Sequence, residues 1–417
     1  MMNPLYNASI ALLRGGIKLS KGFNAKSRRM LEGHKETFAR LRKALEGNES
    51  PVMWIHAASL GEFEQGRPMI EMVKREHPDW KVVLSFFSPS GYEVRKNFPL
   101  ADVVVYLPFD TPANARRFVD AVRPSVAVFV KYEFWGNYLS ALKRRGIPIY
   151  IISAIFRPSQ VFFKPWGGTF RRMLRCFTHL YVQDEASRKL LSGIGVTNVT
   201  VAGDTRFDRV ADVRSSKCKI EWIPRAMEHA SMRFIAGSSW PADEEVYADW
   251  LNARRDVKFI IAPHEFDDVR LAQLKAHFPG RNVMLLSEWQ QAGCPANIEG
   301  LIVDSFGHLS SLYRYADVAY IGGGFGTGIH NVNEAAVYGI PVVFGPRHHK
   351  FREASGLIKC GGGISVASVK EFDDVMDGFL TDPASLKKAG EAAGRYIHEN
   401  LGATRRIYDS IFNKKNL

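Results

Sequence analysis

The 417-residue sequence contains only four cysteines, at positions 176, 218, 294 and 360. They are scattered and form no CxxC pair, which argues against a disulfide framework or a zinc site and is typical of a reducing compartment. The sequence also lacks a DxD motif flanked by strands and any His/Asp cluster with metal-ligand spacing. We therefore predict that the protein binds no metal and uses no cofactor.

The sequence has no hydrophobic run long enough for a transmembrane helix. The longest apolar run near the start, Leu5 to Leu13, is far shorter than the ~20 residues that a spanning helix needs, and no secretory signal pattern accompanies it. Residues 1–45 carry ten Lys/Arg against Glu32 and Glu36, so they hold +8 of the net charge of +13. The segment is either a solvated helix or, as we predict, a basic amphipathic anchor on an anionic cytoplasmic membrane leaflet. No recognised nucleic-acid motif follows it, so we predict no nucleic-acid partner.

The composition, with 46% hydrophobic and 24% charged residues, is that of a soluble globular protein, and the length predicts two domains. Short apolar runs alternate with segments of helical length, which predicts α/β domains with parallel sheets buried on both faces. The predicted strands are residues 52–57, 81–86, 102–107, 126–131, 148–153, 179–183 and 199–203, then 258–263, 282–286, 300–305, 317–323 and 341–345, with "RFIAGSSW" (233–240) beginning the second series.

This alternation predicts two Rossmann-like domains whose sheets face a ligand cleft. We place a basic N-terminal segment at 1–45, an N-terminal domain at 46–205, a polar linker at 206–230 and a C-terminal domain with terminal helices at 231–417.

The glycine-rich stretch "YIGGGFGTGIHNVNEAA" (320–336) follows a predicted strand. Its glycines let backbone N–H groups approach a ligand, and a helix predicted to begin near Asn331 offers its N-terminus to a phosphate. Asn331 and Glu334 share a helix face, where the carboxylate could bind a ribose. Close packing of helix on sheet explains the same glycines equally well. No Gly-Lys-Ser/Thr occurs there, which excludes a Walker phosphate loop.

Two further strand ends carry polar side chains. In "AGSSW" (236–240), Ser238 and Ser239 either cap a helix or bind phosphate oxygens. His264 ends another strand and is either structural or in contact with ligand.

Glu62 lies where the strand in "WIHAASLGEFEQG" (54–66) passes into a helix. A carboxylate at that position is either a first-turn residue favoured by the helix dipole or a general base at the mouth of a cleft. Position alone leaves both interpretations open.

The order of several motifs resembles that of the 3-deoxy-D-manno-octulosonic acid (Kdo) transferases. These motifs are "WIHAASLGEFEQG", "YLPFDTPANARRFVDAVRP", "EFWGN", "GDTRFDRV", "AGSSWPADEE", "APHEFDD", "DSFGHLSSLYRYADVAYIGGGFGTGIHNVNEAA" and "GIPVVFGP". The resemblance covers nearly all of the chain from about residue 50. It implies a GT-B glycosyltransferase that moves Kdo from CMP-Kdo to lipid A precursor on the cytoplasmic face of the bacterial inner membrane.

The resemblance also implies roles for individual residues. The Glu of the family's HAxSxGE motif, its proton acceptor, corresponds to Glu62. The family's CMP contacts correspond to Pro263, His264, Phe306, Gly307, His308, Asn331, Val332, Asn333 and Glu334. Three departures stand out: His264 replaces an Arg, His308 replaces a Glu, and Val332-Asn333 replaces Pro-Leu.

We add Gly237, Ser238, Arg206 and Glu133 to the predicted donor contacts. Arg157 and Arg347 are, with Arg206, candidate partners of the donor's phosphate and carboxylate, or else solvated surface residues. Aromatic and basic residues interleave in segment 156–177, which predicts either a surface for an acylated, phosphorylated acceptor at a membrane or a core-facing amphipathic helix. The residues predicted to contact acceptor or membrane are Arg157, Phe162, Phe163, Trp166, Arg171 and Arg172.

The sequence thus predicts an inverting transferase with Glu62 as base. The alternatives are another GT-B enzyme, which would use a UDP-sugar, and a non-catalytic protein that binds membrane or nucleotide.

Overall fold

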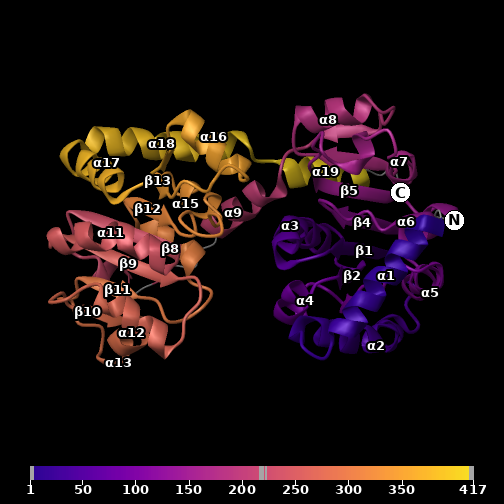
Figure 1. Ribbon diagram of the computed structural model, residues 1–417, viewed down its shortest axis with the longest axis horizontal. Helices are drawn as coiled ribbons and strands as arrows, with labels where there is room; N and C mark the ends of the chain where they lie inside the picture. Colours follow the sequence, from indigo (N-terminus) through magenta and orange to yellow (C-terminus); the bar gives the residue numbers. More distant parts are fainter. Residues whose placement is uncertain (1–3, 216–219, 221–222, 413–417) are drawn as a thin grey trace. The chain divides into compact units, whose positions relative to one another are not determined.

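The computed structural model describes residues 4–215, 220 and 223–412 of the protein. These residues form two compact units, each with its own sheet (Figure 1). Unit 1 comprises Met1–Arg209 and Gly402–Leu417, and unit 2 comprises Val210–Leu401.

Unit 1 is built on a seven-stranded sheet of order β3-β2-β1-β4-β5-β6-β7 in which every adjacent pair is parallel. Its strands are β1 (Val52–Ala57), β2 (Lys81–Phe86), β3 (Val103–Tyr106), β4 (Val126–Val130), β5 (Ile149–Ala154), β6 (His179–Val182) and β7 (Val199–Val201). The central strands are buried throughout, as expected for a sheet covered on both faces.

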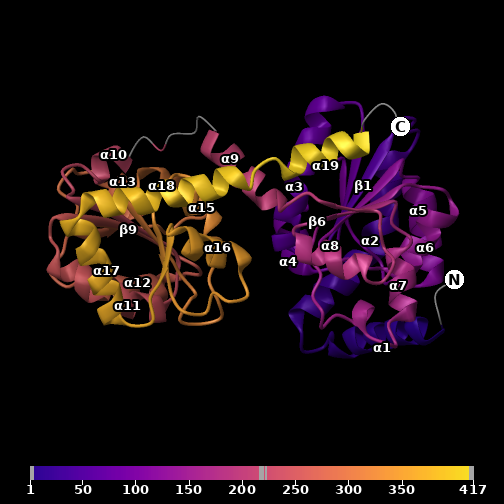
Figure 2. The ribbon, with the colours of Figure 1, turned by 90° about the horizontal axis from the view of Figure 1, so that it is seen from above.

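Helices cover both faces of this sheet (Figure 2). They are α1 (Pro4–Ser20), α2 (Ala25–Leu45), α3 (Leu60–Glu76), α4 (Pro89–Arg95), α5 (Pro112–Val122), α6 (Gly136–Arg144), the 3-10 turn η1 (Val161–Phe163), α7 (Gly168–Leu174), α8 (Glu185–Ser192) and α19 (Ala403–Phe412). One core packs around Trp54 and Phe118 and the other around Ile55 and Phe63. Alternate residues of β1 therefore enter opposite cores, as the two-residue period of a strand requires.

Successive strands are added to one side of β1 as far as β3 and then to its other side from β4 onward, so β1 and β4 are neighbours although β2 and β3 intervene in sequence. In a doubly wound sheet, ligands bind outside the carboxyl ends of the strands at this switch point. Glu62 follows β1 and Glu133 follows β4. The fold therefore places both carboxylates at the switch.

Unit 2 repeats the design with a parallel seven-stranded sheet of order β10-β11-β9-β8-β12-β13-β14. The strands are β8 (Met232–Ser239), β9 (Val257–Pro263), β10 (Val283–Leu285), β11 (Gly300–Ile302), β12 (Val318–Ile321), β13 (Val342–Phe344) and β14 (Gly363–Ser365). Its switch lies between β8 and β12, so the "AGSSW" and glycine-rich stretches meet at one sheet edge.

The helices of unit 2 are α10 (Ile223–Ala226), α11 (Pro241–Ala253), α12 (Asp268–Ala276), α13 (Leu286–Gln291), α14 (Leu309–Leu312), the 3-10 turn η2 (Tyr313–Tyr315), α15 (Asn333–Ala336), α16 (Arg352–Cys360), α17 (Val369–Thr381) and α18 (Pro383–Glu399). Helix α9 (Thr205–Ser215) spans the division between the units. It occupies the first part of the predicted linker at 206–230, of which residues 216–219 and 221–222 lie outside the described residues.

Every predicted strand is present, with ends that differ from the prediction by at most three residues, whereas β14 was not predicted. It is three residues long and lies within "GGGIS", where glycines hide the strand pattern. The last helix also differs from the prediction, because α19 belongs to unit 1 and not to the C-terminal domain. Its Ile407 and Ile411 are buried in the second core of unit 1, beside α3.

The basic N-terminal segment is a packed part of unit 1. Helix α2 contacts β3 and α5, and Thr37 Oγ1 donates a 2.9 Å hydrogen bond to the carbonyl of Tyr106. In α1, Tyr6 donates its hydroxyl to Asp110 at 2.5 Å. One side of α1 nevertheless exposes Leu5, Leu12, Leu19 and, just beyond the helix, Phe23.

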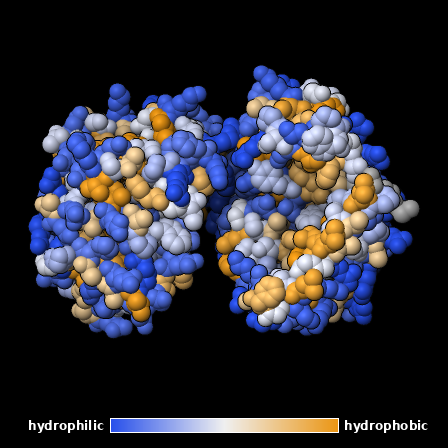
Figure 3. All heavy atoms as spheres, in the orientation of Figure 1, coloured by the Kyte–Doolittle hydropathy of each residue, from blue (hydrophilic) through white to orange (hydrophobic). Residues whose placement is uncertain are grey.

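These apolar side chains form a row along α1 (Figure 3). The seven-residue spacing from Leu5 to Leu12 to Leu19 explains the row, since it returns each residue to nearly the same helix face. No helix among the described residues is both long and apolar enough to cross a membrane.

The contribution of α19 to unit 1 is testable. We expect Ile407→Ala to lower the free energy of unfolding by about 2–4 kcal/mol, because it leaves a cavity at a fully buried site. Urea unfolding of the full chain measures the change. Arg405→Ala, on the exposed face of the same helix, should cost less than about 0.5 kcal/mol. Equal effects of the two substitutions would contradict this packing.

Candidate active site

Glu62 lies in the first turn of α3, directly after β1. Its Oε2 accepts a 2.6 Å hydrogen bond from the backbone N–H of Ala58, while the N-cap residue Ser59 makes no side-chain cap. The contact resembles helix capping, so part of the cap interpretation holds. Among the described residues, however, Oε1 of Glu62 accepts no hydrogen bond. One oxygen orients the carboxylate and the other is left to take a proton.

The surroundings of Glu62 favour its neutral form. The pKa of this carboxyl is raised from 4.5 to about 7; burial is the largest cause, and the charge of Glu133 acts in the same direction. The N–H of Ala58 and the charges of His56 and Lys131 oppose the shift with smaller effects. A solvated cap residue lacks this burial, so the raised pKa is typical of a general base that works near neutral pH.

Glu133 is held by a buried network. Trp135 Nε1 donates to its Oε2 at 2.5 Å, and His56 Nε2 lies 2.9 Å from the same oxygen. The other ring nitrogen of His56 lies 2.9 Å from the hydroxyl of Ser85, whose Cα is paired with that of His56 in the sheet register. Such a connected network fixes Glu133 in one geometry.

Two residues at these strand ends have a left-handed backbone. Lys131, which follows β4, has φ 62°, and Ser238, at a bulge in β8, has φ 54°. Residues with a Cβ adopt such φ values rarely and at a cost of about 1–3 kcal/mol. Strain of this kind clusters at functional sites, and here it occurs at the switch point of each sheet.

In unit 2, an aromatic stack lies at the carboxyl ends of β8 and β9. The rings of Trp240 and His264 are stacked with centroids 4.8 Å apart, and the ring of His330 is 4.2 Å from that of His264. Trp240 Nε1 donates to Nε2 of His330 at 3.3 Å. Burial, with a smaller effect of His264, lowers the pKa of His330 to about 4, so His330 is neutral at physiological pH.

The glycines of the glycine-rich loop serve backbone packing. A Cβ on Gly322 would lie 2.2 Å from the carbonyl oxygen of Ser238, and one on Gly324 would lie 2.5 Å from the backbone of Gly345. Gly237 packs in the same way, since a Cβ there would overlap the hydroxyl of Tyr313. The buried carboxylate of Asp243 secures the loop by accepting the N–H of Gly323 at 2.7 Å. Packing thus accounts for these three glycines.

The Asn331–Glu334 pair is formed, but the helix beside it differs from the prediction. Asn331 Nδ2 donates to Glu334 Oε1 at 3.0 Å, and Ser310 donates to the other oxygen at 2.5 Å. The helix, α15, begins at Asn333 and has four residues, so its dipole is small. Val332 and Asn333 are fully buried, and their predicted contact with the donor stays a prediction.

Four other predicted donor residues lie at the end of β9 or on the loop after β11. Phe306 is 77% exposed and stacks on Phe266 with ring centroids 4.8 Å apart, while Gly307 (φ 97°) and His308 lead into α14. Pro263 ends β9 as a buried residue beside His264. These four predicted residues follow neighbouring strands, β9 and β11, at one sheet edge.

Two predicted donor contacts belong to unit 1. Glu133 lies near Glu62, whose pKa it raises through its charge. Arg206 is paired with the buried carboxylate of Asp204, at 2.7 Å. That pair gives Arg206 a structural partner. In unit 2, the exposed Arg347 donates a hydrogen bond to the carbonyl of Gly326.

The aromatic–basic segment is largely internal, as the alternative interpretation held. Phe162 is 4% exposed within the first core, so its prediction as a membrane contact is wrong, and Phe163 packs against that core. Arg171 donates from Nη1 to the carbonyls of Phe162 and Lys164, both at 3.1 Å. Trp166 is 74% exposed, and Arg157 and Arg172 are also exposed.

Sequence reasoning gave no role to His56, Trp135, Asp243, Trp240 or His330. The sequence could have pointed to them only through their location, because each lies within or beside a motif at a strand end. Across residues 4–215, 220 and 223–412, no group of three or more His, Cys, Asp or Glu side chains is arranged to hold a metal ion.

Residues 32–209 match a family described as 3-deoxy-D-manno-octulosonic-acid transferase (kdotransferase). The chain is 26% identical to a 3-deoxy-D-manno-octulosonic acid transferase of Bordetella pertussis, over 91% of this chain and 92% of that one. It is 25% identical to an enzyme of the same name from Aquifex aeolicus, over 84% of this chain and 92% of that one. The resemblance predicted from the motifs is confirmed, and the protein is an enzyme of the glycosyltransferase class.

Solved structures share the fold. A UDP-GlcNAc 2-epimerase of Neisseria meningitidis aligns with a TM-score of 0.60 at 14% identity, over 87% of this chain and 100% of that one. MurG of Acinetobacter baumannii aligns with a TM-score of 0.54 at 14% identity, over 87% of this chain and 99% of that one. The predicted GT-B fold, with two parallel sheets, is confirmed.

The raised pKa of Glu62 predicts a pH-dependent cost to folding. A carboxyl whose folded pKa exceeds its unfolded value destabilises the folded state as pH rises from about 4.5 to about 7, and the full cost remains above pH 7. We expect Glu62→Gln to raise the free energy of unfolding by about 1–2 kcal/mol at pH 8, because the amide is neutral. The gain should shrink as the pH falls toward 4.5.

Denaturant unfolding at pH 8, 6 and 5 measures this gain. The matched control is Glu71→Gln on the same helix, where partly exposed pairs with Arg67 and Arg209 predict a loss of at most about 1 kcal/mol and no gain at high pH. A gain for Glu62→Gln that does not vary with pH would contradict the predicted titration.

Proposed function

We propose that this divergent member of the Kdo transferase family transfers Kdo from CMP-Kdo to lipid A precursor, with inversion and with Glu62 as general base. The observation that carries the proposal is the Glu62 carboxyl: oriented by Ala58 N–H, with one oxygen unbonded among the described residues, and with its pKa raised to about 7. A base of that pKa removes the proton of an attacking hydroxyl efficiently at neutral pH.

The proposed reaction forms one bond, breaks one bond and transfers one proton. The acceptor hydroxyl oxygen attacks the anomeric carbon of Kdo, the bond from that carbon to the CMP phosphate oxygen breaks, and CMP leaves with the bonding electrons. Glu62 takes the hydroxyl proton as the new glycosidic bond forms. Glu133, fixed by Trp135 and His56, acts through its charge, which raises the pKa of Glu62 and so strengthens it as a base.

The proposed donor contacts lie in unit 2. The Glu334 carboxylate, oriented by Asn331 and Ser310, supports ribose binding because it can accept hydroxyl hydrogen bonds. His264 and the exposed Phe306 present aromatic faces at the carboxyl edge of the sheet, where a planar base can stack.

The proposed place of action is the cytoplasmic face of the inner membrane. The support is the exposed row of Leu5, Leu12, Leu19 and Phe23 within a segment of net charge +8. An amphipathic helix of this kind lies in the interface of an anionic bilayer.

Turnover of CMP-Kdo with lipid A precursor tests the proposed function. We expect Glu62→Gln to reduce kcat by about 100- to 10,000-fold, because the amide cannot accept the proton. The wild-type kcat/KM should rise with pH through about 7, since protonated Glu62 is inactive below that value. Formation of radiolabelled product at several pH values measures both.

Glu71→Gln is the matched control and should keep wild-type activity. Glu133→Gln should move the acidic limb of the pH profile to lower pH, because it removes the neighbouring negative charge. Wild-type turnover of UDP-sugars in place of CMP-Kdo would favour the alternative GT-B activity. Undiminished turnover by Glu62→Gln would exclude Glu62 as the base.

Metal independence is part of the proposal. We expect kcat in about 5 mM EDTA, a large excess over trace divalent cations, to stay within about twofold of the untreated value. The measurement is product formation before and after chelation, and again after magnesium is added back. Activity that EDTA abolishes and magnesium restores would show that transfer needs a divalent cation.

A further inference from the structure

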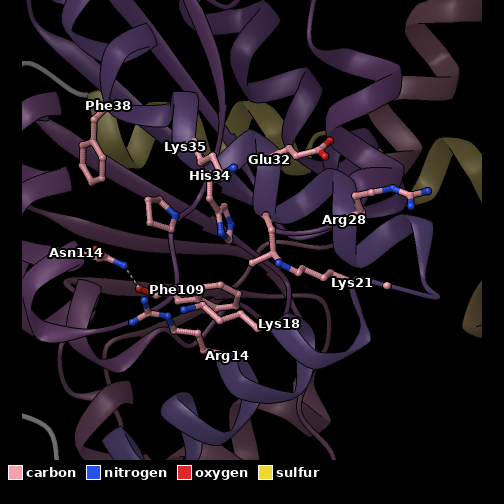
Figure 4. A pocket seen from close by; sticks show the side chains of 13 residues that line it. Arg14, Lys18, Lys21, Arg28, Glu32, His34, Lys35, Phe38, Phe109 and Asn114 are labelled. Atoms are coloured by element: carbon pink, nitrogen blue, oxygen red, sulfur yellow. Dashed lines mark hydrogen bonds between the residues drawn. The ribbon is translucent and has the colours of Figure 1, made fainter.

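A cavity of about 680 Å³ lies between α1, α2 and the loop that follows β3. Figure 4 shows basic side chains from the two helices on opposite sides of it, with His34 and Phe109 between them. The five basic residues of the lining are Arg14, Lys18, Lys21, Arg28 and Lys35. Glu32 is the one acidic residue of the lining.

The cations of this cavity are uncompensated. None of the five side chains forms an ion pair or hydrogen bond with any described residue. Elsewhere in unit 1, basic side chains are commonly paired, as Lys74 is with Asp102 at 2.7 Å and Arg67 with Glu71 at 2.7 Å. Five cations around one cavity, without protein partners, raise the local potential and favour an anion.

The walls of the cavity are partly apolar, and a neutral histidine lies among them. Leu31, Phe38, Pro108 and Phe109 contribute to the lining. His34 Nε2 is buried and has no hydrogen-bond partner among the described residues. Burial lowers the pKa of His34 to about 4, so its ring is neutral and can accept or donate only one bond at Nε2. The cavity thus suits an anionic group attached to a less polar body.

A row of aromatic rings connects this cavity with Glu62. Phe109 follows β3, Phe87 follows β2 and Trp135 follows β4, and all lie at the carboxyl edge of one sheet. The ring of Phe87 is 6.4 Å from that of Phe109 and 4.7 Å from that of Trp135, which hydrogen-bonds Glu133. Since β3 and β1 are two strands apart, the cavity is offset from the Glu62 strand by about 10 Å.

We propose that this cavity is an acceptor subsite that binds a phosphate group of the acceptor, while the sugar body lies along Phe109, Phe87 and Trp135 toward Glu62. Lys18 and Lys35, from opposite helices, contact the phosphate, because ammonium groups form strong charge-assisted hydrogen bonds with phosphate oxygens. The inference rests on the proposed function, whose acceptor is a phosphorylated glycolipid. It also reassigns acceptor recognition from segment 157–172 to α1 and α2.

Equilibrium binding without donor tests the subsite. The probes are detergent micelles that contain lipid A precursor, the same lipid after removal of its phosphates, or phosphatidylglycerol. We expect the wild-type chain to bind the phosphorylated precursor at least about tenfold more tightly than either other probe. Lys18→Ala/Lys35→Ala should abolish this preference, and in turnover it should raise the acceptor KM about tenfold with little change in kcat.

The matched control is Lys26→Ala/Lys43→Ala, which removes the same charge from exposed positions of α2 outside the lining. It should keep the preference, and thermal unfolding should match for both double variants. An equal loss in the control, a preference retained by Lys18→Ala/Lys35→Ala, or equally tight wild-type binding of phosphatidylglycerol would each overturn the subsite. Because binding is read without CMP-Kdo, failure of turnover alone would count against the proposed function and not against the subsite.

Discussion

The central constraint on unit 1 is that it holds two carboxylates close together at a half-buried sheet edge, which costs folding free energy. Glu62 and Glu133 repel one another where water is partly excluded, so at neutral pH the pair binds a proton more readily than isolated glutamates do. The fold supports this arrangement with rigid neighbours: β1 and β4 fix the backbone, and Trp135 and His56 fix Glu133. Active sites commonly lower the stability of the folded state in this way, because their function requires an unfavourable arrangement of groups.

Parallel topology explains why the polar residues gather where they do. In each unit the sheet order reverses once, between β1 and β4 or between β8 and β12, and the loops diverge there. Glu62, Glu133 and Lys131 lie at the first switch point. The second collects Ser238 and the glycine-rich loop, whose glycines allow backbone segments to pack closely. Ligand-contacting side chains can then project from loops held by strands on both sides.

The strands, the two-unit organisation and the location of Glu62 could be predicted, because apolar runs and strand–helix junctions are local features of the sequence. Burial of individual side chains could not. Phe162 and Val332 share their local pattern with exposed residues, and only tertiary packing distinguishes them. The packing of α19 in unit 1 could not be predicted either, since Ile407 and Ile411 contact core residues that lie about 330 positions earlier in the sequence. The basic cavity is lined by residues of both helices and of the loop after β3, so no single sequence motif could predict it.

The proposed function and the proposed subsite together create one electrostatic conflict at the carboxyl edge of unit 1. A phosphorylated acceptor needs cations, yet cations near Glu62 would lower its pKa and weaken it as a base, as Lys131 already does slightly. Aromatic rings resolve the conflict because they extend the binding surface without adding charge. The offset of about 10 Å between the β3 and β1 strands weakens the effect of such cations on Glu62, because the Coulomb energy falls with distance. A phosphate subsite and a neutral-range carboxyl base can therefore share one sheet edge only when an uncharged row such as Phe109, Phe87 and Trp135 separates them.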